Sequence, residues 1–174
     1  MTQLSKPGTA PNAGDGAGDG AVYDHVHMLC RIVLSGAETG GAFAMVEERA
    51  ALGAMTPKHV HAREAETFIV LDGALEGWCE GSSTLVEAGS MIHLPAGKQH
   101  AFRIASASAH YYTLITPSGF EAFFRESGVL LDQAFGGALP VPAPLSPEEV
   151  GRLVELVAPY GVEIVGPPPF GPAE

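Results

Sequence analysis

The amino-acid sequence predicts an all-β domain, a sandwich or barrel built from short antiparallel strands. The 174 residues include 22 Gly and 14 Pro but only 17% charged residues, which fits many tight turns and few long charged helices. Short runs rich in β-forming residues follow one another roughly every 8–12 residues and are bounded by Gly, Pro or Ser. Strands do not alternate with long amphipathic helices, so a parallel α/β sheet is not expected.

Nine strands are expected, each ending near a turn signal such as Asp72-Gly73. Residues two apart on a strand point to the same face, so each run can offer one face to a core. The expected strands are His25–Leu34, Gly41–Glu48, Lys58–Val60, Thr67–Leu71, Ala74–Glu80, Ser83–Glu87, Ser90–Leu94, His100–Ile104 and His110–Thr116.

Two helices are expected after the strands. The first covers Gly119–Ser127, where Ser118 and Glu121 have the spacing of a capping box. The second covers Pro147–Ala158, with Ser146 as the capping residue and proline at the tolerated first position. The apolar residues of both segments recur at i, i+3 and i+4, so each helix has one face that can pack on the strands.

The chain is expected to form one domain preceded by a tail. Residues 1–20 contain almost no large apolar side chain and cannot offset their ordering entropy by burial, so a mobile tail is expected there. Residues 21–174 form the domain, with a barrel core at about 23–117 and a helical extension at 118–174. No internal repeat suggests a second barrel.

Charge and cysteine content exclude several classes of partner. The formal net charge is −11, with 20 acidic and 9 basic residues and no basic cluster, which argues against nucleic acid and anionic membrane surfaces. No apolar stretch approaches the roughly 20 residues that span a bilayer. Cys30 and Cys79 are the only cysteines and do not make a disulfide framework, so reduced thiols and a cytoplasmic location are expected.

The segment Gly53–Gly73 contains a candidate metal site. His59 and His61 are two residues apart, so on a strand both imidazoles point to one face and can converge on an ion. Glu66 opens the next apolar run and can add a carboxylate. Glu64 is close by, but its position has the opposite parity and is interpreted as a solvated loop residue.

A third imidazole comes from Gly89–His100. His100 begins a strand that, paired antiparallel to the first segment, can bring its ring to the same ion. Three His and one Glu suit Fe, Mn, Ni, Co, Cu or Zn, and a five- or six-coordinate ion would keep open positions for a reactant.

These two segments resemble the two motifs of the cupin superfamily. The first has Gly, five residues, His-x-His, four residues, Glu, six residues and Gly; the second has Gly, five residues, Pro-x-Gly, two residues and His. One departure is Ile104, where many cupins carry Asn. The run SGFEAFFRESG at 118–128 is similar to single-domain quercetin-dioxygenase-like cupins. The resemblance implies a jelly-roll barrel (a double-stranded β-helix), one divalent transition metal held by His59, His61, Glu66 and His100, and a homodimer.

Three functions remain open from the sequence. The resemblance favours a dioxygenase for a small aromatic or enolic, flavonol-like substrate, with Glu66 as both ligand and general base. Strand parity suggests a pocket wall of Phe68, Met91, Phe102 and Ile104. The alternatives are a non-redox metal-dependent isomerase, cyclase or lyase, and a small-molecule-binding cupin without turnover.

Overall fold

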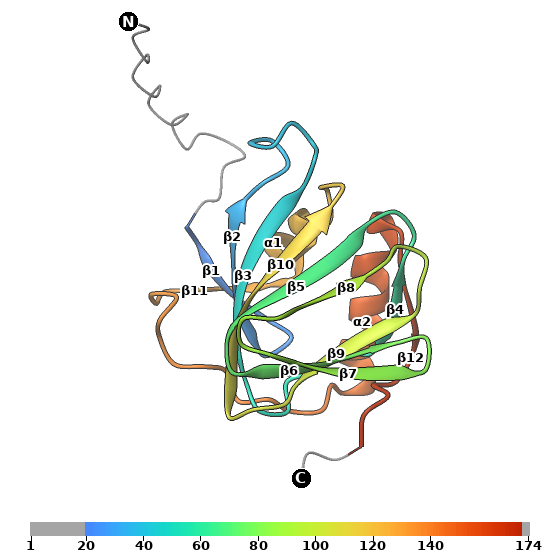
Figure 1. The fold of residues 1–174 in the computed structure, drawn as a ribbon. Helices are drawn as coiled ribbons and strands as arrows, with labels where there is room; N and C mark the ends of the chain where they lie inside the picture. Colours follow the sequence, from blue (N-terminus) through green and yellow to red (C-terminus); the bar gives the residue numbers. More distant parts are fainter. Residues whose placement is uncertain (1–19, 172–174) are drawn as a thin grey trace, which may run out of the picture.

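The computed structural model describes residues 20–171, which fold into two antiparallel sheets that face each other (Figure 1). The seven-stranded sheet has the order β11-β1-β2-β3-β10-β5-β8, and the five-stranded sheet has the order β12-β4-β9-β6-β7. The strands are β1 Val22–His25, β2 Met28–Leu34, β3 Ala44–Ala51, β4 Lys58–His61, β5 Ala65–Asp72, β6 Ala74–Cys79, β7 Ser82–Glu87, β8 Met91–Leu94, β9 His100–Ile104, β10 Ser108–Thr116, β11 Val129–Leu131 and β12 Val162–Gly166.

This architecture confirms the predicted all-β class and jelly-roll barrel. Every strand pairing between residues 20 and 171 is antiparallel, including the long central pairings of β10 with β3 and with β5. Buried and partly exposed residues alternate along the whole of β10, because one face of the strand packs on the core and the other does not. The inward face therefore carries Ala109, Tyr111, Thr113 and Ile115.

Two helices cover the open side of the barrel: α1 at Glu121–Ser127 and α2 at Pro147–Val157. Figure 1 shows both behind the strands, with α2 next to β4 and β12. Phe120, Phe123 and Phe124 of the α1 segment join a buried cluster that includes Val157 of α2 and Val162 of β12. The helices thus close one end of the space between the sheets.

The caps of the two helices differ from each other. Ser146 caps α2 with the complete capping box expected from the sequence. The box expected at Ser118 is absent, because α1 begins after Phe120 and has no side-chain cap. Glu121 instead accepts hydrogen bonds from the backbone N–H groups of Gly36 and Gly119, so this carboxylate ties the helix to the β2–β3 loop.

The expected strand His25–Leu34 is a hairpin. Val26 and His27 have positive φ values of 53° and 63°, and the chain reverses there between β1 and β2. Positive φ at both central residues is the geometry of a tight two-residue hairpin turn, which usually contains Gly or Asn. Neither residue type is present, so the sequence carries no signal for the reversal.

The extension beyond residue 117 contributes two strands as well as the helices. β11 pairs with β1, and β12 pairs with β4 in the register Ile164 to His59. Both strands are short and were not expected from the sequence. The expected tail at residues 1–20 lies almost wholly outside the described residues.

Two further features concern the described part of the chain. Cys30 and Cys79 are free thiols on different sheets. Between residues 20 and 171, no helix has the length and apolar character needed to cross a bilayer.

Candidate metal centre

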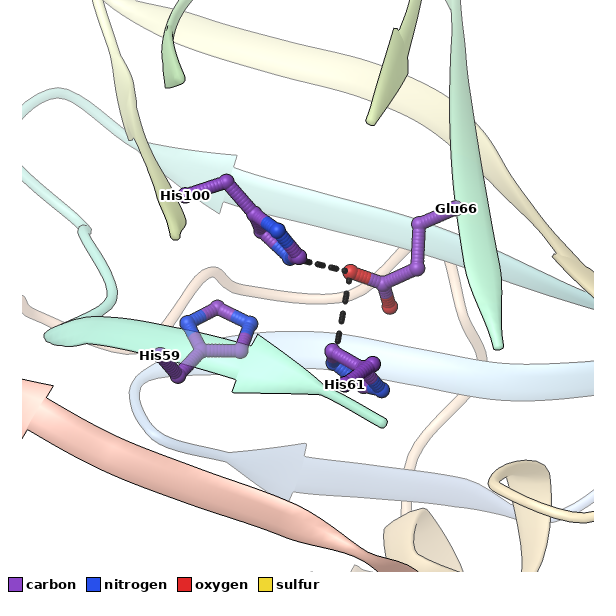
Figure 2. A group of neighbouring side chains, drawn as sticks. All are labelled: His59, His61, Glu66 and His100. Atoms are coloured by element: carbon purple, nitrogen blue, oxygen red, sulfur yellow. Dashed lines mark hydrogen bonds and ion pairs between the residues drawn. The ribbon is translucent and has the colours of Figure 1, made fainter. Parts of the chain in front are cut away.

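The four residues expected as metal ligands come together between the two sheets. His59 and His61 lie on β4, His100 begins β9, and Glu66 lies on β5 of the opposite sheet. One ligand atom from each of the four lies within 4.8 Å of the others. Figure 2 shows the three rings and the carboxylate pointing toward one another. His59 is directly paired with His100 in the sheet, which explains how residues 41 positions apart meet.

Backbone carbonyls set the orientation of two imidazoles. The Nδ1 of His59 lies 3.0 Å from the carbonyl oxygen of Pro57, and the Nδ1 of His100 lies 3.0 Å from that of Lys98. A carbonyl oxygen can only accept, so each Nδ1 carries a proton and each Nε2 is the ring nitrogen left for a metal. Hydrogen bonds of this kind commonly fix the tautomer of metal-binding histidines.

Glu66 lies at the centre of the cluster. Its Oε2 is 3.3 Å from Nε2 of His100 and 3.6 Å from Nε2 of His61. Burial by itself would raise the pKa of Glu66, but the neighbouring His61, His100 and His59 lower it to about 2, so the carboxylate is charged. Burial lowers the pKa of His59 to about 3, with His100 adding to the effect, and burial also lowers the pKa of His61.

The donor set fits a divalent transition metal. Both ring nitrogens of His61 are buried and make no hydrogen bond. Buried polar atoms are nearly always satisfied, so the unsatisfied Nε2 of His61, 3.6 Å from the Glu66 carboxylate, fits a position that holds a cation. Neutral imidazoles and an ionised carboxylate are the protonation states that metal binding requires.

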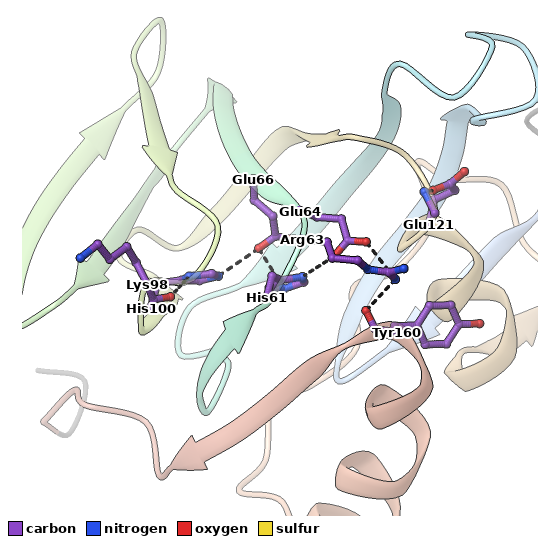
Figure 3. Close-up of polar contacts among 9 residues, drawn as sticks. His61, Arg63, Glu64, Glu66, Lys98, His100, Glu121 and Tyr160 are labelled. Carbon is purple, nitrogen blue, oxygen red and sulfur yellow. Dashed lines mark hydrogen bonds and ion pairs between the residues drawn. The ribbon is translucent and has the colours of Figure 1, made fainter.

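Glu64 lies behind His61 and is not the solvated loop residue expected from the sequence. Its side chain is only 2% exposed, and its Oε2 is 3.9 Å from Nδ1 of His61. Arg63 lies 3.3 Å from the other oxygen and donates to the carbonyl of Tyr160 at 3.0 Å. Figure 3 shows this row of polar groups leading from the metal centre toward the end of α2. The alternation of strand residues predicted the wrong environment for Glu64, because residues 62–64 form the turn between β4 and β5 and do not continue a strand.

A cavity of about 70 Å³ adjoins the metal centre. His59, Glu66, Phe68 and Phe102 line it. Phe68 and Phe102 were expected as wall residues, whereas the other two expected wall residues lie elsewhere. Ile104 packs in the barrel core with Leu75 and Tyr111. Met91 is 65% exposed, because it pairs with Ile69 on the outward face of β5 and β8.

Several cavity residues were not assigned to the site from the sequence. Phe120, Phe123 and Phe124 line the cavity, and the ring of Phe120 meets that of His61 edge-on with centroids 4.4 Å apart. The sequence shows these three residues at helical spacing, but packing of the helix against the barrel accounts for that spacing without any role in a binding site. His25 also lines the cavity, and its Nδ1 lies 2.9 Å from the Ser127 hydroxyl. Nothing in its sequence context pointed to the site.

Glu48 is a further residue of the cavity wall that was not assigned to the site from the sequence. It lies on β3 between Val46 and Ala50, and all three side chains are buried. The alternation with Val46 was a usable signal, because it places an acidic residue in the inward row of a strand.

A larger groove of about 860 Å³ lies outside the cavity. Val26, Pro57 and Ile164 line both, so the two spaces adjoin. The remaining groove lining is mostly apolar and comes from the Leu52–Met55 segment, the Pro142–Leu145 segment, α2 and β12. This volume lies within the range of roughly 300–1,000 Å³ that is typical of small-molecule sites.

A three-His, one-Glu cluster lies between the sheets of a jelly-roll barrel, and the cupin domain family model matches residues 46–115. The matched region contains all four residues of the centre. The chain is also 32% identical over 101 residues to quercetin 2,3-dioxygenase from Bacillus subtilis (strain 168). That alignment covers 58% of this chain and 30% of the relative, so the chain corresponds to less than a third of that protein.

Solved structures support the fold. The structure of KdgF from Halomonas sp. superposes with a TM-score of 0.50 at 20% identity, covering 55% of this chain and 85% of that one. A protein from Thermotoga maritima described as a predicted oxalate decarboxylase gives a TM-score of 0.50 at 15% identity, covering 61% and 96%. At these identities the likeness concerns the barrel alone.

Proposed function

We propose that this protein is a metal-dependent dioxygenase that acts on a small aromatic or enolic molecule with an acidic hydroxyl group. The observation that carries the proposal is the convergence of three imidazoles and one carboxylate beside a largely apolar cavity. The similarity to quercetin 2,3-dioxygenase supports an oxygenase and a flavonol-like substrate class.

His59, His61, Glu66 and His100 would hold the ion, which can be Fe, Mn, Ni, Co, Cu or Zn by its ligand set. A divalent metal bound there supplies Lewis acidity toward the substrate oxygen and, when it is redox-active, reactivity with dioxygen. The imidazole orientations are fixed in advance by Pro57 and Lys98, so ligand geometry costs little to organise.

Glu66 is the group that accepts the substrate proton in this proposal. Its low pKa keeps it ionised at neutral pH, and its carboxylate faces the cavity. A hydroxyl group that enters the cavity can donate a hydrogen bond to a Glu66 oxygen, and this oxygen is the acceptor for its proton in the proposal. The rings of Phe68, Phe102 and Phe120 exclude water from this position and favour a flat apolar substrate.

The adjoining groove accommodates the bulk of such a substrate. The cavity is too small for more than the reacting end of an aromatic molecule, whereas the groove is about twelve times larger. Entry past Val26, Pro57 and Ile164 would place the apolar body in the groove and the acidic hydroxyl beside Glu66.

Oxygen uptake tests the proposal. The protein is reconstituted separately with Fe(II), Mn(II), Ni(II), Co(II), Cu(II) and Zn(II), and each form is assayed against flavonols and other enolic aromatics. We expect substrate-dependent uptake with at least one redox-active metal, abolished in Glu66→Ala and retained in Glu87→Ala, an exposed position on β7. Absence of uptake with every metal and substrate refutes the oxygenase and favours a non-redox lyase or isomerase.

A further inference from the structure

The cavity beside the metal centre contains a second buried carboxyl group, that of Glu48. Its side chain lines the same cavity as His59 and Glu66, and the residue is 3% exposed. In the sheet, Glu48 on β3 is directly opposite Tyr111 on β10, one strand away from the β5 strand that carries Glu66. Two acidic groups thus occupy one inner sheet face.

The partners of Glu48 are hydroxyl groups only. Thr113 donates a hydrogen bond to its Oε2, and Tyr111 is a second hydrogen-bonding neighbour. Within residues 20–171, no Arg, Lys or His forms an ion pair with Glu48. The preceding residue, Glu47, is also buried, at 5% exposed, but its carboxylate lies on the other, outward face of β3 and pairs with Arg31 and His110.

Burial without a cationic partner favours the neutral form of this carboxyl group. Burial raises the pKa of Glu48 to about 8; the Thr113 hydrogen bond opposes the rise and the charge of Glu66 adds to it. A neutral carboxyl keeps one O–H donor. The cavity therefore offers an acceptor at Glu66 and a donor at Glu48 among mainly apolar walls, the arrangement by which small-molecule sites orient their ligands.

We propose that Glu48 is a substrate-binding residue whose carboxyl O–H donates a hydrogen bond to a second oxygen of the substrate while the acidic hydroxyl lies at Glu66 and the metal centre. This inference rests on the proposed function and narrows it. The substrate carries an acidic hydroxyl and a carbonyl close to it on one flat apolar skeleton. A molecule with the hydroxyl alone leaves Glu48 without its partner.

Ligand binding to the zinc-loaded protein tests this inference without requiring turnover. The probes are 3-hydroxyflavone, with its hydroxyl and carbonyl on neighbouring carbons, and 2-naphthol, which has only the hydroxyl. Kd is measured by calorimetry for the parent, Glu48→Leu, Glu48→Gln and the outward-facing control Glu47→Gln. Zinc content and circular dichroism are recorded for each variant.

We expect Glu48→Leu to weaken 3-hydroxyflavone binding about tenfold, the value of one hydrogen bond, and to leave 2-naphthol binding unchanged. Glu48→Gln keeps an N–H donor and should lose much less affinity, and Glu47→Gln should lose none. Equal changes for the two probes, no change for 3-hydroxyflavone, or failure of the parent to bind it would overturn the inference. The Kd pattern can hold even where no metal supports oxygen uptake, so the two proposals fail separately.

Discussion

Replacing Glu48 with glutamine should change how the stability of the protein depends on pH. In the unfolded chain this carboxyl ionises near its ordinary pKa of 4.5, whereas burial raises the pKa to about 8 in the folded protein. Because the folded pKa is the higher one, the stability associated with the neutral carboxyl is complete below pH 4.5 and is lost as the pH rises toward 8.

The size of the change in unfolding free energy follows from the difference between the pKa of 4.5 in the unfolded chain and the pKa of about 8 in the folded protein. At pH 7 the unfolded carboxyl is about 2.5 pH units above its pKa while the folded one is still mostly protonated. Each unit corresponds to ~1.4 kcal/mol, so burying this group costs roughly 3 kcal/mol at pH 7 relative to pH 4.5. A glutamine does not titrate and avoids this cost, so the variant gains relative stability over that range.

Urea denaturation of the metal-free proteins, followed by circular dichroism between pH 4.5 and 7.5, measures the difference. We expect the unfolding free energy of Glu48→Gln minus that of the parent to grow by about 3 kcal/mol as the pH rises. Glu87→Gln, which removes an exposed carboxylate on β7, controls for the change in net charge. A difference that does not depend on pH would mean that Glu48 ionises normally inside the barrel.

Four further outcomes are expected. His59→Ala and His100→Ala should each lose tightly bound metal, as measured by elemental analysis; retention of the parent's metal content would disprove the ligand assignment. Glu64→Gln should weaken metal affinity about tenfold or more in competition with a chelator, because Glu64 lies behind the Nδ1 of His61, while unaltered affinity would assign Glu64 a role in folding alone. Phe120→Ala should lower the free energy of unfolding by ~3–5 kcal/mol in denaturant titrations, the usual cost of deleting a buried aromatic ring. Sedimentation should show a homodimer, because the edge strand β7 exposes Leu85 and the edge strand β8 exposes Met91; a monomeric parent would contradict this.

Much of the barrel and the composition of its metal centre could be predicted from the sequence because both depend on local spacing. The two-residue interval between His59 and His61 fixes a common face on any strand, and glycine turns such as Gly73 mark the strand ends. The fixed gaps to Glu66 and His100 then identify the rest of the centre.

The features that escaped prediction depend on contacts between distant segments. β12 forms a strand because it pairs with the edge of β4, about 100 residues earlier in the chain. The residues of β12 themselves do not indicate that this edge is available. Phe120 belongs to the cavity wall because α1 packs over the barrel end, where its ring reaches His61. Met91 was expected as a wall residue, but in the register of β5 with β8 it pairs with Ile69 and Ile92 pairs with Phe68, so Met91 points to the outward face.

The pairing of β12 with β4 is completed late in synthesis, after all four ligands of the candidate metal centre have been made. The last ligand, His100, leaves the ribosome some sixty residues before Val162, so all four ligands are available while β4 still lacks its outer neighbour. Until β12 arrives, the backbone N–H and C=O groups on that edge of the ligand strand are open to pairing with another chain. Protection of the ligand strand β4 from pairing with another chain therefore depends on a five-residue strand that is made after all four ligands.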